Sequence, residues 1–218
     1  MSNIMKQNAD QRAHPFNKPD LAFLPAGETP HIVPPDGALV RRARNGDDAA
    51  FRRLVERYEE QIASTVIGMM GEGPDAEEIG QRVFVKFYEA LDDFRGDAAL
   101  GTYLTRIAMN LCLNEKRRQK RWYRRFISRD GAMDLPEPAY EDDASFDMKE
   151  LLRRALEHLS DKHRAVVVLR LIEGRSTRET AEILEVAEGT VLSRLARARS
   201  ALKEMLSPYL EDERHGAI

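Results

Sequence analysis

The side chains best suited to bind a polyanion lie near the C-terminus, in the stretch GTVLSRLARARSALKEML (residues 189–206). Apolar residues recur there at steps of three or four, which predicts an amphipathic helix with one buried stripe: Val191, Leu195, Ala198, Leu202 and Leu206. The remaining surface offers hydroxyl and guanidinium groups, which suit phosphate oxygens and guanine edges: Thr190, Ser193, Arg194, Arg197 and Arg199. For an isolated basic helix, a solvated face would be the simpler interpretation. The element that precedes it in the chain therefore decides between a solvated face and a surface that binds an anion.

That element is STRETAEIL (176–184), in which Ser176 and Glu179 have capping-box spacing. The turn EVAEG separates it from the basic helix, and the whole pattern is typical of a helix-turn-helix. In this motif the second helix presents its outward N-terminal residues to the major groove. We therefore expect the outward residues of the basic helix, together with Arg178 on the first helix, to contact DNA.

A second basic segment, NEKRRQKRWYRRF (114–126), interleaves cations with Trp122, Tyr123 and Phe126. At helical spacing Arg117, Lys120, Arg121 and Arg124 form a broad positive face. Cations along a backbone with aromatic rings between them are typical of single-strand binding, because bases stack on the rings. The alternative is a helix end whose cations complement the helix dipole and whose aromatic rings pack inward.

Charge is unevenly distributed in this chain of 218 residues, although its net charge is only −3. Residues 115–129 contain eight Lys or Arg and one Glu, whereas residues 130–150 contain eight Asp or Glu and one Lys. Adjacent blocks of opposite sign indicate separate surfaces with separate partners, or mutual contact before a partner arrives. The lone Cys112 falls in an apolar stripe and fits a reducing compartment. With no long apolar run or signal peptide, we expect a soluble cytoplasmic protein without membrane insertion.

The periodicity predicts an all-α chain with four helices, a linker and four further helices. Asp36, Asp47, Asp75 and Ser160 are the expected N-caps, and Glu78 has capping-box spacing after Asp75. The expected domains are a proline-rich disordered tail (1–35), a helical domain (36–126), a flexible acidic linker (127–147), a helix-turn-helix domain (148–207) and a tail (208–218).

Three stretches together resemble the extracytoplasmic-function sigma factors of the sigma-70 family. DAEEIGQRVFVKFYEALDDFRGDAALGTYLTRIAMNLCLNEKRR (75–118), with GDDAAFRRLVERYEEQI (46–62) before it, looks like their region 2. LSDKHRAVVVLRLIEGRSTRETAEILEVAEGTVLSRLARARSALKEML (159–206) is similar to their region 4. The resemblance implies a promoter-specificity subunit of bacterial RNA polymerase, with no catalytic site, metal or cofactor of its own.

The resemblance also implies a role for each surface. The helix from Asp75 would dock on the clamp of core RNA polymerase through Glu78, Gln81, Arg82 and Lys86. The FRGDAALGTY loop and the following helix would melt the minus-ten element and hold a flipped base, through Tyr103, Arg106, Asn110, Asn114, Lys116, Arg117 and Lys120. The helix-turn-helix would read the minus-thirty-five element as duplex, and its domain would meet the polymerase flap. The acidic linker would occupy the RNA exit path, and an anti-sigma factor is the expected regulator.

The chain departs from the family pattern at several of these positions. Arg82 stands where an acid is usual, and Leu100 and Tyr103 stand where Phe and Trp are frequent. Leu192 replaces a frequent basic residue near the start of the recognition helix, so the promoter sequence cannot be transferred from the family.

Two other classes of protein compete with this interpretation. A self-sufficient DNA-binding regulator would explain the helix-turn-helix but not the basic–aromatic helix or the stretches GDDAAF and DAEEIGQRVF. An enzyme would need a catalytic constellation, and the five histidines form no close-spaced set with Cys or carboxylates. Binding to duplex promoter DNA without polymerase would favour the regulator.

Overall fold

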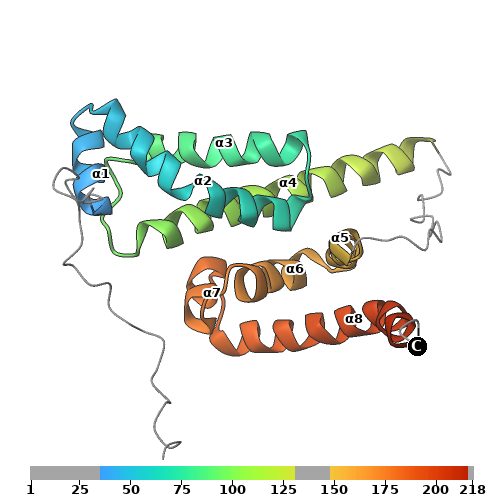
Figure 1. Cartoon of the computed structure of the whole chain (residues 1–218). Coiled ribbons are helices and arrows are strands. Elements are labelled where there is room, and N and C mark those ends of the chain that lie inside the picture. Colours follow the sequence, from blue (N-terminus) through green and yellow to red (C-terminus); the bar gives the residue numbers. More distant parts are fainter. Residues whose placement is uncertain (1–34, 131–147, 216–218) are drawn as a thin grey trace, which may run out of the picture. The chain divides into compact units, whose positions relative to one another are not determined.

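The computed structural model describes residues 35–130 and 148–215, and this part of the chain is helical without any strand, as the sequence predicts. Figure 1 shows the helices in chain order. The bounds are α1 Asp36–Arg44, α2 Asp48–Met70, α3 Pro74–Glu89, α4 Leu100–Asp130, α5 Met148–His158, α6 Asp161–Val167, the π-helix η1 Val168–Ile172, α7 Thr177–Leu184 and α8 Glu188–His215. The N-terminal tail and most of the predicted linker lie outside the described residues. Among the described helices, none combines the length and the apolar character needed to cross a bilayer.

Two helices are longer than the sequence predicts. Helix α4 continues beyond residue 126 to Asp130, because residues 127–130 contain no helix breaker and the first glycine is Gly131. Helix α8 continues through Pro208 to His215 instead of ending near residue 207. Proline removes one backbone donor, but residues 209–215 include good helix formers that extend the helix beyond it.

The predicted N-caps divide into two groups. The side chain of Asp47 accepts a hydrogen bond from the backbone N–H of Ala50, and Ser176 and Glu179 form a complete capping box. Ser160 occupies the N-cap position of α6 but makes no side-chain cap bond. The predictions for Asp36 and Asp75 are wrong, because α1 starts after Pro35 and α3 starts after Gly73.

Both misassigned carboxylates have tertiary partners instead of capping roles. Asp36 accepts from Arg57 and Tyr58 of α2, and these contacts fix α1 on α2. Asp75 accepts from the side-chain amide of Gln119 on α4 at 2.9 Å. Glu78 forms an ion pair with Arg82 at 3.5 Å rather than closing a capping box.

The capping box of α7 supports a stability prediction. Replacing Ser176 by alanine should lower the free energy of unfolding by about 1 kcal/mol, because the backbone N–H of Glu179 loses its acceptor. Urea denaturation of the full chain measures this change. Ser193→Ala is the matched control, since Ser193 lies inside α8 and only donates to the carbonyl of Thr190. Equal unfolding curves for Ser176→Ala and the parent chain would contradict the prediction.

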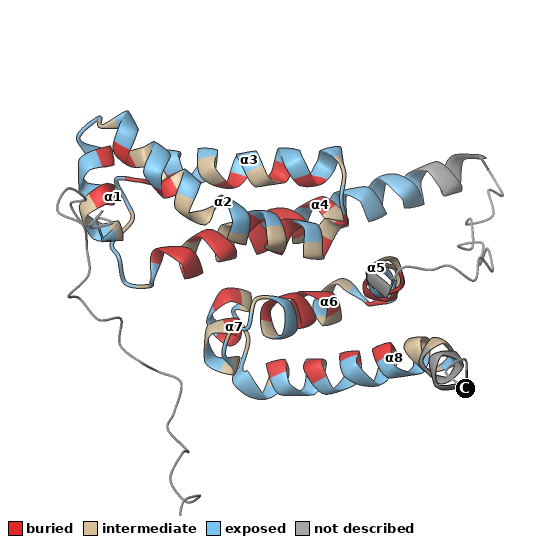
Figure 2. Ribbon diagram, viewed as in Figure 1, coloured by how far each residue is buried: buried red, intermediate tan, exposed pale blue. Residues whose placement is uncertain are grey.

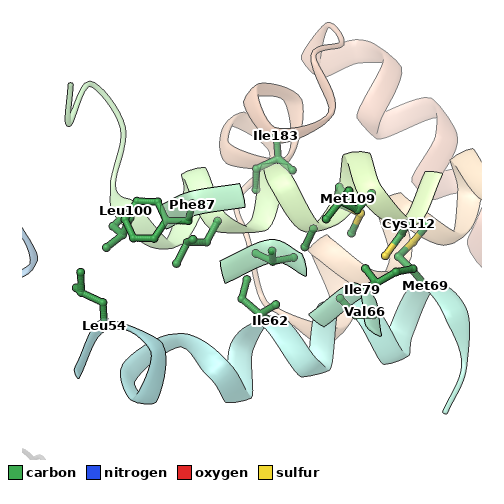
Figure 3. Close-up of a cluster of buried hydrophobic side chains, with 14 of the residues drawn as sticks. Leu54, Ile62, Val66, Met69, Ile79, Phe87, Leu100, Met109, Cys112 and Ile183 are labelled. Carbon is green, nitrogen blue, oxygen red and sulfur yellow. The ribbon is translucent and has the colours of Figure 1, made fainter. Parts of the chain in front are cut away.

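The N-terminal helices α1–α4 enclose an apolar core. Its fully buried side chains come from all four helices and include Leu39, Leu54, Ile62, Met69, Val83, Phe87, Leu104 and Met109. Figure 3 shows several of these side chains meeting between α2, α3 and α4. Phe87 lies 6.0 Å from Phe51 between ring centroids and contacts two further rings edge-on. This core holds α4 rigidly along its first half.

The C-terminal helices have two small apolar clusters of their own. One joins α5, α6 and α8 around Leu156, Val167 and Ala198, and the other joins α6, α7 and α8 around Val166, Val191 and Leu195. Figure 2 shows the buried residues of α8 along the side that faces α6, with exposed residues on the opposite side. The predicted buried stripe of this helix is confirmed from Val191 to Leu202, and Leu206 is half-buried.

The two halves also share a core, which the sequence did not predict. Ala165, Val168, Leu169 and Ile183 from the C-terminal half are buried in the same cluster as the α1–α4 core. The described residues from 35 onward therefore form one compact unit.

Candidate nucleic-acid interface

The helix-turn-helix predicted from the sequence is present as α7, a short turn and α8. Glu185 begins the turn in the left-handed region, at a φ of 53°, and the backbone N–H of Val186 donates to the carbonyl of Ala181 at 3.1 Å. Ala181 of α7 and Val191 and Leu195 of α8 pack together in one cluster. This packing fixes the direction in which the outward side of α8 points.

The predicted DNA-binding residues on the outward side of α8 differ in their exposure to solvent. Ser193, Arg197 and Arg199 are exposed, whereas Thr190 and Arg194 are half-buried. Nearby on α6, burial and then neighbouring cations that include Arg197 and Arg194 lower the pKa of His163. The start of α8 is therefore a positively charged surface, which suits phosphate groups.

Arg178, predicted to belong to the same surface, has an acidic partner. Its Nε lies 3.1 Å from a carboxylate oxygen of Glu182, one turn further along α7. The Arg178 side chain is 80% exposed, so this pair is weak and can exchange for a phosphate contact. Of the two helices in the motif, α8 carries the less compensated positive charge.

On α4, one side of the helix presents three of the predicted strand-binding residues to solvent. Asn110, Asn114 and Arg117 are exposed and follow one another at steps of four and three residues. Arg117 donates to Oδ1 of Asn114 at 3.2 Å, which aligns the amide and the guanidinium on one surface. These groups can together bind base edges and a sugar–phosphate backbone.

The aromatic residues of the basic segment lie outside the core. Trp122 is 55% exposed and Tyr123 is 36% exposed, which contradicts the alternative in which both rings pack inward. The side chain of Phe126 lies outside the described residues. Exposed rings among arginines can stack on unpaired bases.

Lys116 and Lys120, also predicted to bind phosphates, lie toward the C-terminal half instead. Nζ of Lys120 is 2.6 Å from a carboxylate oxygen of Asp161 on α6. Lys116 is half-buried, and burial together with the nearby charge of Arg164 lowers its pKa. The structure thus separates these two lysines from the side that carries Asn110, Asn114 and Arg117.

Tyr103 and Arg106 occupy the first turns of α4, and both are half-buried. The ring of Tyr103 lies 4.9 Å from the ring of Phe94 and 6.1 Å from that of Phe87, between centroids. The Nε of Arg106 is buried without a hydrogen-bond partner. Tyr103 therefore packs against the loop before α4, and Arg106 retains a donor without a hydrogen bond.

Arg44 is a residue of this site that the sequence did not reveal. Its Nε donates to the carbonyl of Leu91 at 2.7 Å, and a second nitrogen donates to the carbonyl of Phe94. These carbonyls lie in the segment between α3 and Gly96, which has a positive φ of 77°. Arg44 thereby anchors the loop that precedes α4. No local pattern could have indicated this, because its partners lie about fifty residues away in the chain.

We expect Arg44→Ala to lower the free energy of unfolding by about 1.5–3 kcal/mol, because a charged group loses hydrogen bonds to two carbonyls. Urea denaturation measures the loss. Arg41→Ala, an exposed arginine of the same helix, is the control and should change stability much less. If the two variants unfold alike, Arg44 does not anchor the loop.

The predicted polymerase-docking residues lie on an exposed side of α3. Glu78, Gln81, Arg82 and Lys86 are all exposed. Beside them, Val85 and Tyr88 are 56% and 54% exposed, apolar residues that sequence reasoning did not include. A groove of about 600 Å³ runs between α2 and α3, with Ile62 and Phe84 among its apolar residues and Glu59, Glu72 and Glu77 among its acids. An apolar groove with acidic residues suits a basic amphipathic partner.

Cys112 has the role predicted for it. Its side chain is fully buried in the α1–α4 core, and burial raises the pKa of its thiol to about 12. Such a thiol is a packing residue, because the reactive species is the thiolate.

Comparison with known proteins identifies the two halves separately. Residues 54–122 match the family model described as Sigma-70 region 2, and residues 149–202 match Sigma-70, region 4. The chain is 34% identical to the ECF RNA polymerase sigma-E factor of Escherichia coli (strain K12) over 185 residues, which covers 80% of this chain and 96% of that protein. It is 31% identical to the RNA polymerase sigma-H factor of Pseudomonas aeruginosa over 189 residues, covering 81% and 96%.

Two solved structures have a similar arrangement. One is CnrH in complex with the cytosolic domain of CnrY, with a TM-score of 0.59 and 27% identity over 79% of this chain and 97% of that chain. The other is the sigma factor RpoE from Bartonella quintana in complex with the anti-sigma factor NepR, with a TM-score of 0.58 and 26% identity over 72% and 96%.

Proposed function

Since the chain belongs to the extracytoplasmic-function sigma factors of bacterial RNA polymerase, we propose that its two halves share promoter recognition: α8 reads duplex DNA at the minus-thirty-five element, and α4 captures the single strand at the minus-ten element. A sigma factor is a promoter-specificity subunit and not a catalyst. The observation that supports this division most directly is that each half presents its own cationic surface.

The surface on α8 suits a duplex. Its cations and hydroxyls lie on the outward side of a helix whose other side is fully buried, so the helix can enter a major groove as a rigid element. Thr190, Ser193, Arg194 and Arg197 occupy its first turns, where a recognition helix contacts bases, and Arg199 follows. Arg178 on α7 faces the flanking phosphates in this arrangement.

The surface on α4 suits a single strand. The amides of Asn110 and Asn114 can donate hydrogen bonds to base edges and accept hydrogen bonds from them. Arg117 can bind the sugar–phosphate backbone of the same strand. Exposed Trp122 and Tyr123 lie about one and a half turns beyond Arg117 and provide stacking surfaces. The loop anchored by Arg44, with Tyr103 and Arg106 behind it, is the site at which we place the flipped base.

The exposed side of α3 is the surface we assign to core RNA polymerase. Glu78, Gln81, Arg82 and Lys86 supply polar contacts for the clamp, and the exposed side chains of Val85 and Tyr88 add apolar area beside them. The C-terminal half would meet the flap. Because the protein would act on core polymerase and promoter DNA, we assign it to the cytoplasm. The two solved relatives, one bound to CnrY and the other to NepR, support an anti-sigma factor as its regulator.

Transcription with purified bacterial core polymerase tests this function. Core enzyme, a library of genomic promoter fragments and the full chain should give promoter-specific transcripts that are absent when the chain is omitted. The free chain should bind duplex DNA only weakly, since its cationic surfaces are small and divided between the two halves. Nanomolar binding of the free chain to a specific duplex, without any promoter opening by polymerase, would show a self-sufficient regulator instead.

A further inference from the structure

The outward side of α8 is uncharged along its centre. At about 3.6 residues per turn, Arg197 and Arg199 lie about 80° to either side of the line through Gly189, and both are exposed (Figure 2). The exposed residues between these two flanks are small or apolar: Gly189, Leu192, Ser193, Ala196 and Ser200. A helix in a major groove would turn this centre toward base edges and its cationic flanks toward the phosphates of the two groove walls.

Leu192 is the large apolar side chain of this centre. It is 55% exposed, whereas its neighbour Val191 is fully buried. A helical side chain points back over the turn that precedes it, so Leu192 extends over Gly189, which has no side chain. Outside its own helix backbone and its two neighbours in the chain, no described atom lies within 4 Å of a Cβ added at Gly189. The protein therefore leaves Leu192 uncovered at the leading end of the helix that we assign to the duplex.

Ala196 continues the apolar surface one turn later. It is exposed, and four residues after Leu192 it lies on the same side of α8. The rise between the two positions is about 6 Å, somewhat less than two base-pair steps of about 3.4 Å. A single exposed leucine is ordinary on a protein surface. Here the leucine is followed by a second apolar residue and flanked by cations, which suits neighbouring base pairs that present an apolar edge.

Thymine is the base that presents such an edge in the major groove, through its 5-methyl group. Guanine presents two acceptors there and cytosine presents an amino donor. These groups lose hydration when they meet a side chain that offers no hydrogen bond, which is costly. A leucine in this place therefore favours thymine and also selects against a G·C pair.

We propose that Leu192, assisted by Ala196, reads the methyl groups of thymines in the minus-thirty-five element. This inference rests on the proposed function and adds a determinant of specificity to it. At a position where the family frequently has a basic residue, this chain has an apolar contact in place of a hydrogen-bonded one. The preferred promoter accordingly has an A·T pair at the base pair that faces Leu192.

Replacement of thymine by deoxyuridine tests this proposal, because it removes the methyl group and keeps every hydrogen-bonding group of the base. A promoter found in the transcription test supplies the duplex, and the thymines of its minus-thirty-five element are replaced one at a time. Competition binding then compares the substituted and unsubstituted duplexes. The protein is the holoenzyme, assembled from core polymerase with the full parent chain or its Leu192→Ala variant.

The parent holoenzyme should bind at least one substituted duplex about fourfold more weakly, the factor that corresponds to about 0.8 kcal/mol for a buried methyl group. The Leu192→Ala holoenzyme should bind the same pair of duplexes alike. Leu152→Ala is the matched control, because Leu152 is a leucine of α5 that is 45% exposed, and it should keep the fourfold preference.

Two results would overturn the proposal: a parent holoenzyme that binds every substituted duplex as well as the original, or a thymine preference that persists in Leu192→Ala. Failure of the proposed function has a different signature, since the parent chain would then give no promoter-specific transcripts with core polymerase.

A second variant tests the same contact by changing its preference. Leu192→Arg introduces a guanidinium that can pair bidentately with guanine, so guanine should be preferred over thymine at the base pair identified by deoxyuridine, by about tenfold. Duplexes with T·A, G·C and C·G at that base pair measure the order of preference. An unchanged order in Leu192→Arg would show that residue 192 does not face this base pair and would refute the assignment.

Discussion

Promoter opening should fall by about 100-fold when Asn110 and Arg117 are both replaced by alanine, while core polymerase and closed complexes still bind. Each contact to an unpaired base or its backbone contributes about 1–3 kcal/mol. Two contacts of about 1.4 kcal/mol each, in the lower part of this range, give a factor of about 100. Both side chains are exposed on one side of α4, so their removal leaves the core of the N-terminal half intact.

Permanganate reactivity of unpaired thymines near the start site measures the opening, and filter binding measures the closed complex. Arg118→Ala is a matched control, because Arg118 is equally cationic and exposed but binds the carboxylate of Glu115 through two nitrogens at 2.8 Å. If the double variant opens the promoter as well as Arg118→Ala does, α4 does not hold the single strand through these residues.

Specific promoter binding by the holoenzyme should fall about ten- to hundredfold when Arg194 or Arg197 is replaced by alanine. A guanidinium that pairs bidentately with guanine contributes about 1–3 kcal/mol to discrimination, and its loss relaxes specificity at one base pair. Loss of a guanidinium that binds phosphate instead lowers the affinity for all sequences alike. It also reduces the slope of log affinity against log salt concentration by about one. Arg197 is exposed and Arg194 is half-buried, so the two variants can differ in type of contact.

Competition binding against base-substituted promoters, repeated at several salt concentrations, distinguishes the two kinds of contact. Lys203→Ala is the control, because Lys203 is an exposed cation of α8 that lies beyond the predicted recognition residues. Parental affinity and specificity in both arginine variants would show that the outward side of α8 does not read the minus-thirty-five element.

Local patterns predicted most of the secondary structure, because helix periodicity and capping depend on neighbouring residues. The stripe from Val191 to Leu202 and the capping box at Ser176 follow from spacing alone. Asp36 and Asp75 were misassigned as caps for the same reason: their partners, Arg57 and Gln119, lie 21 and 44 residues away. Nothing in the local sequence distinguishes a capping carboxylate from one that pairs across the fold.

In the candidate sites too, local sequence patterns predicted exposure but not contacts between distant segments. The exposed positions of Asn110, Asn114 and Arg117 agree with helical spacing. The engagement of Lys120 by Asp161 does not follow from spacing, since it requires knowing that α6 packs beside α4. Arg44 was overlooked because its role depends on the approach of distant segments.

Consecutive residues of the run from Ala165 to Leu169 join different apolar clusters, and this has a genetic consequence. Val166 and Val167 hold the helix-turn-helix half together, whereas Val168 and Leu169 face the other half of the chain. Mutations at adjacent codons should therefore give different phenotypes. Damage at 166 or 167 should unfold the helix-turn-helix half, while conservative changes at 168 should loosen only its contact with α2.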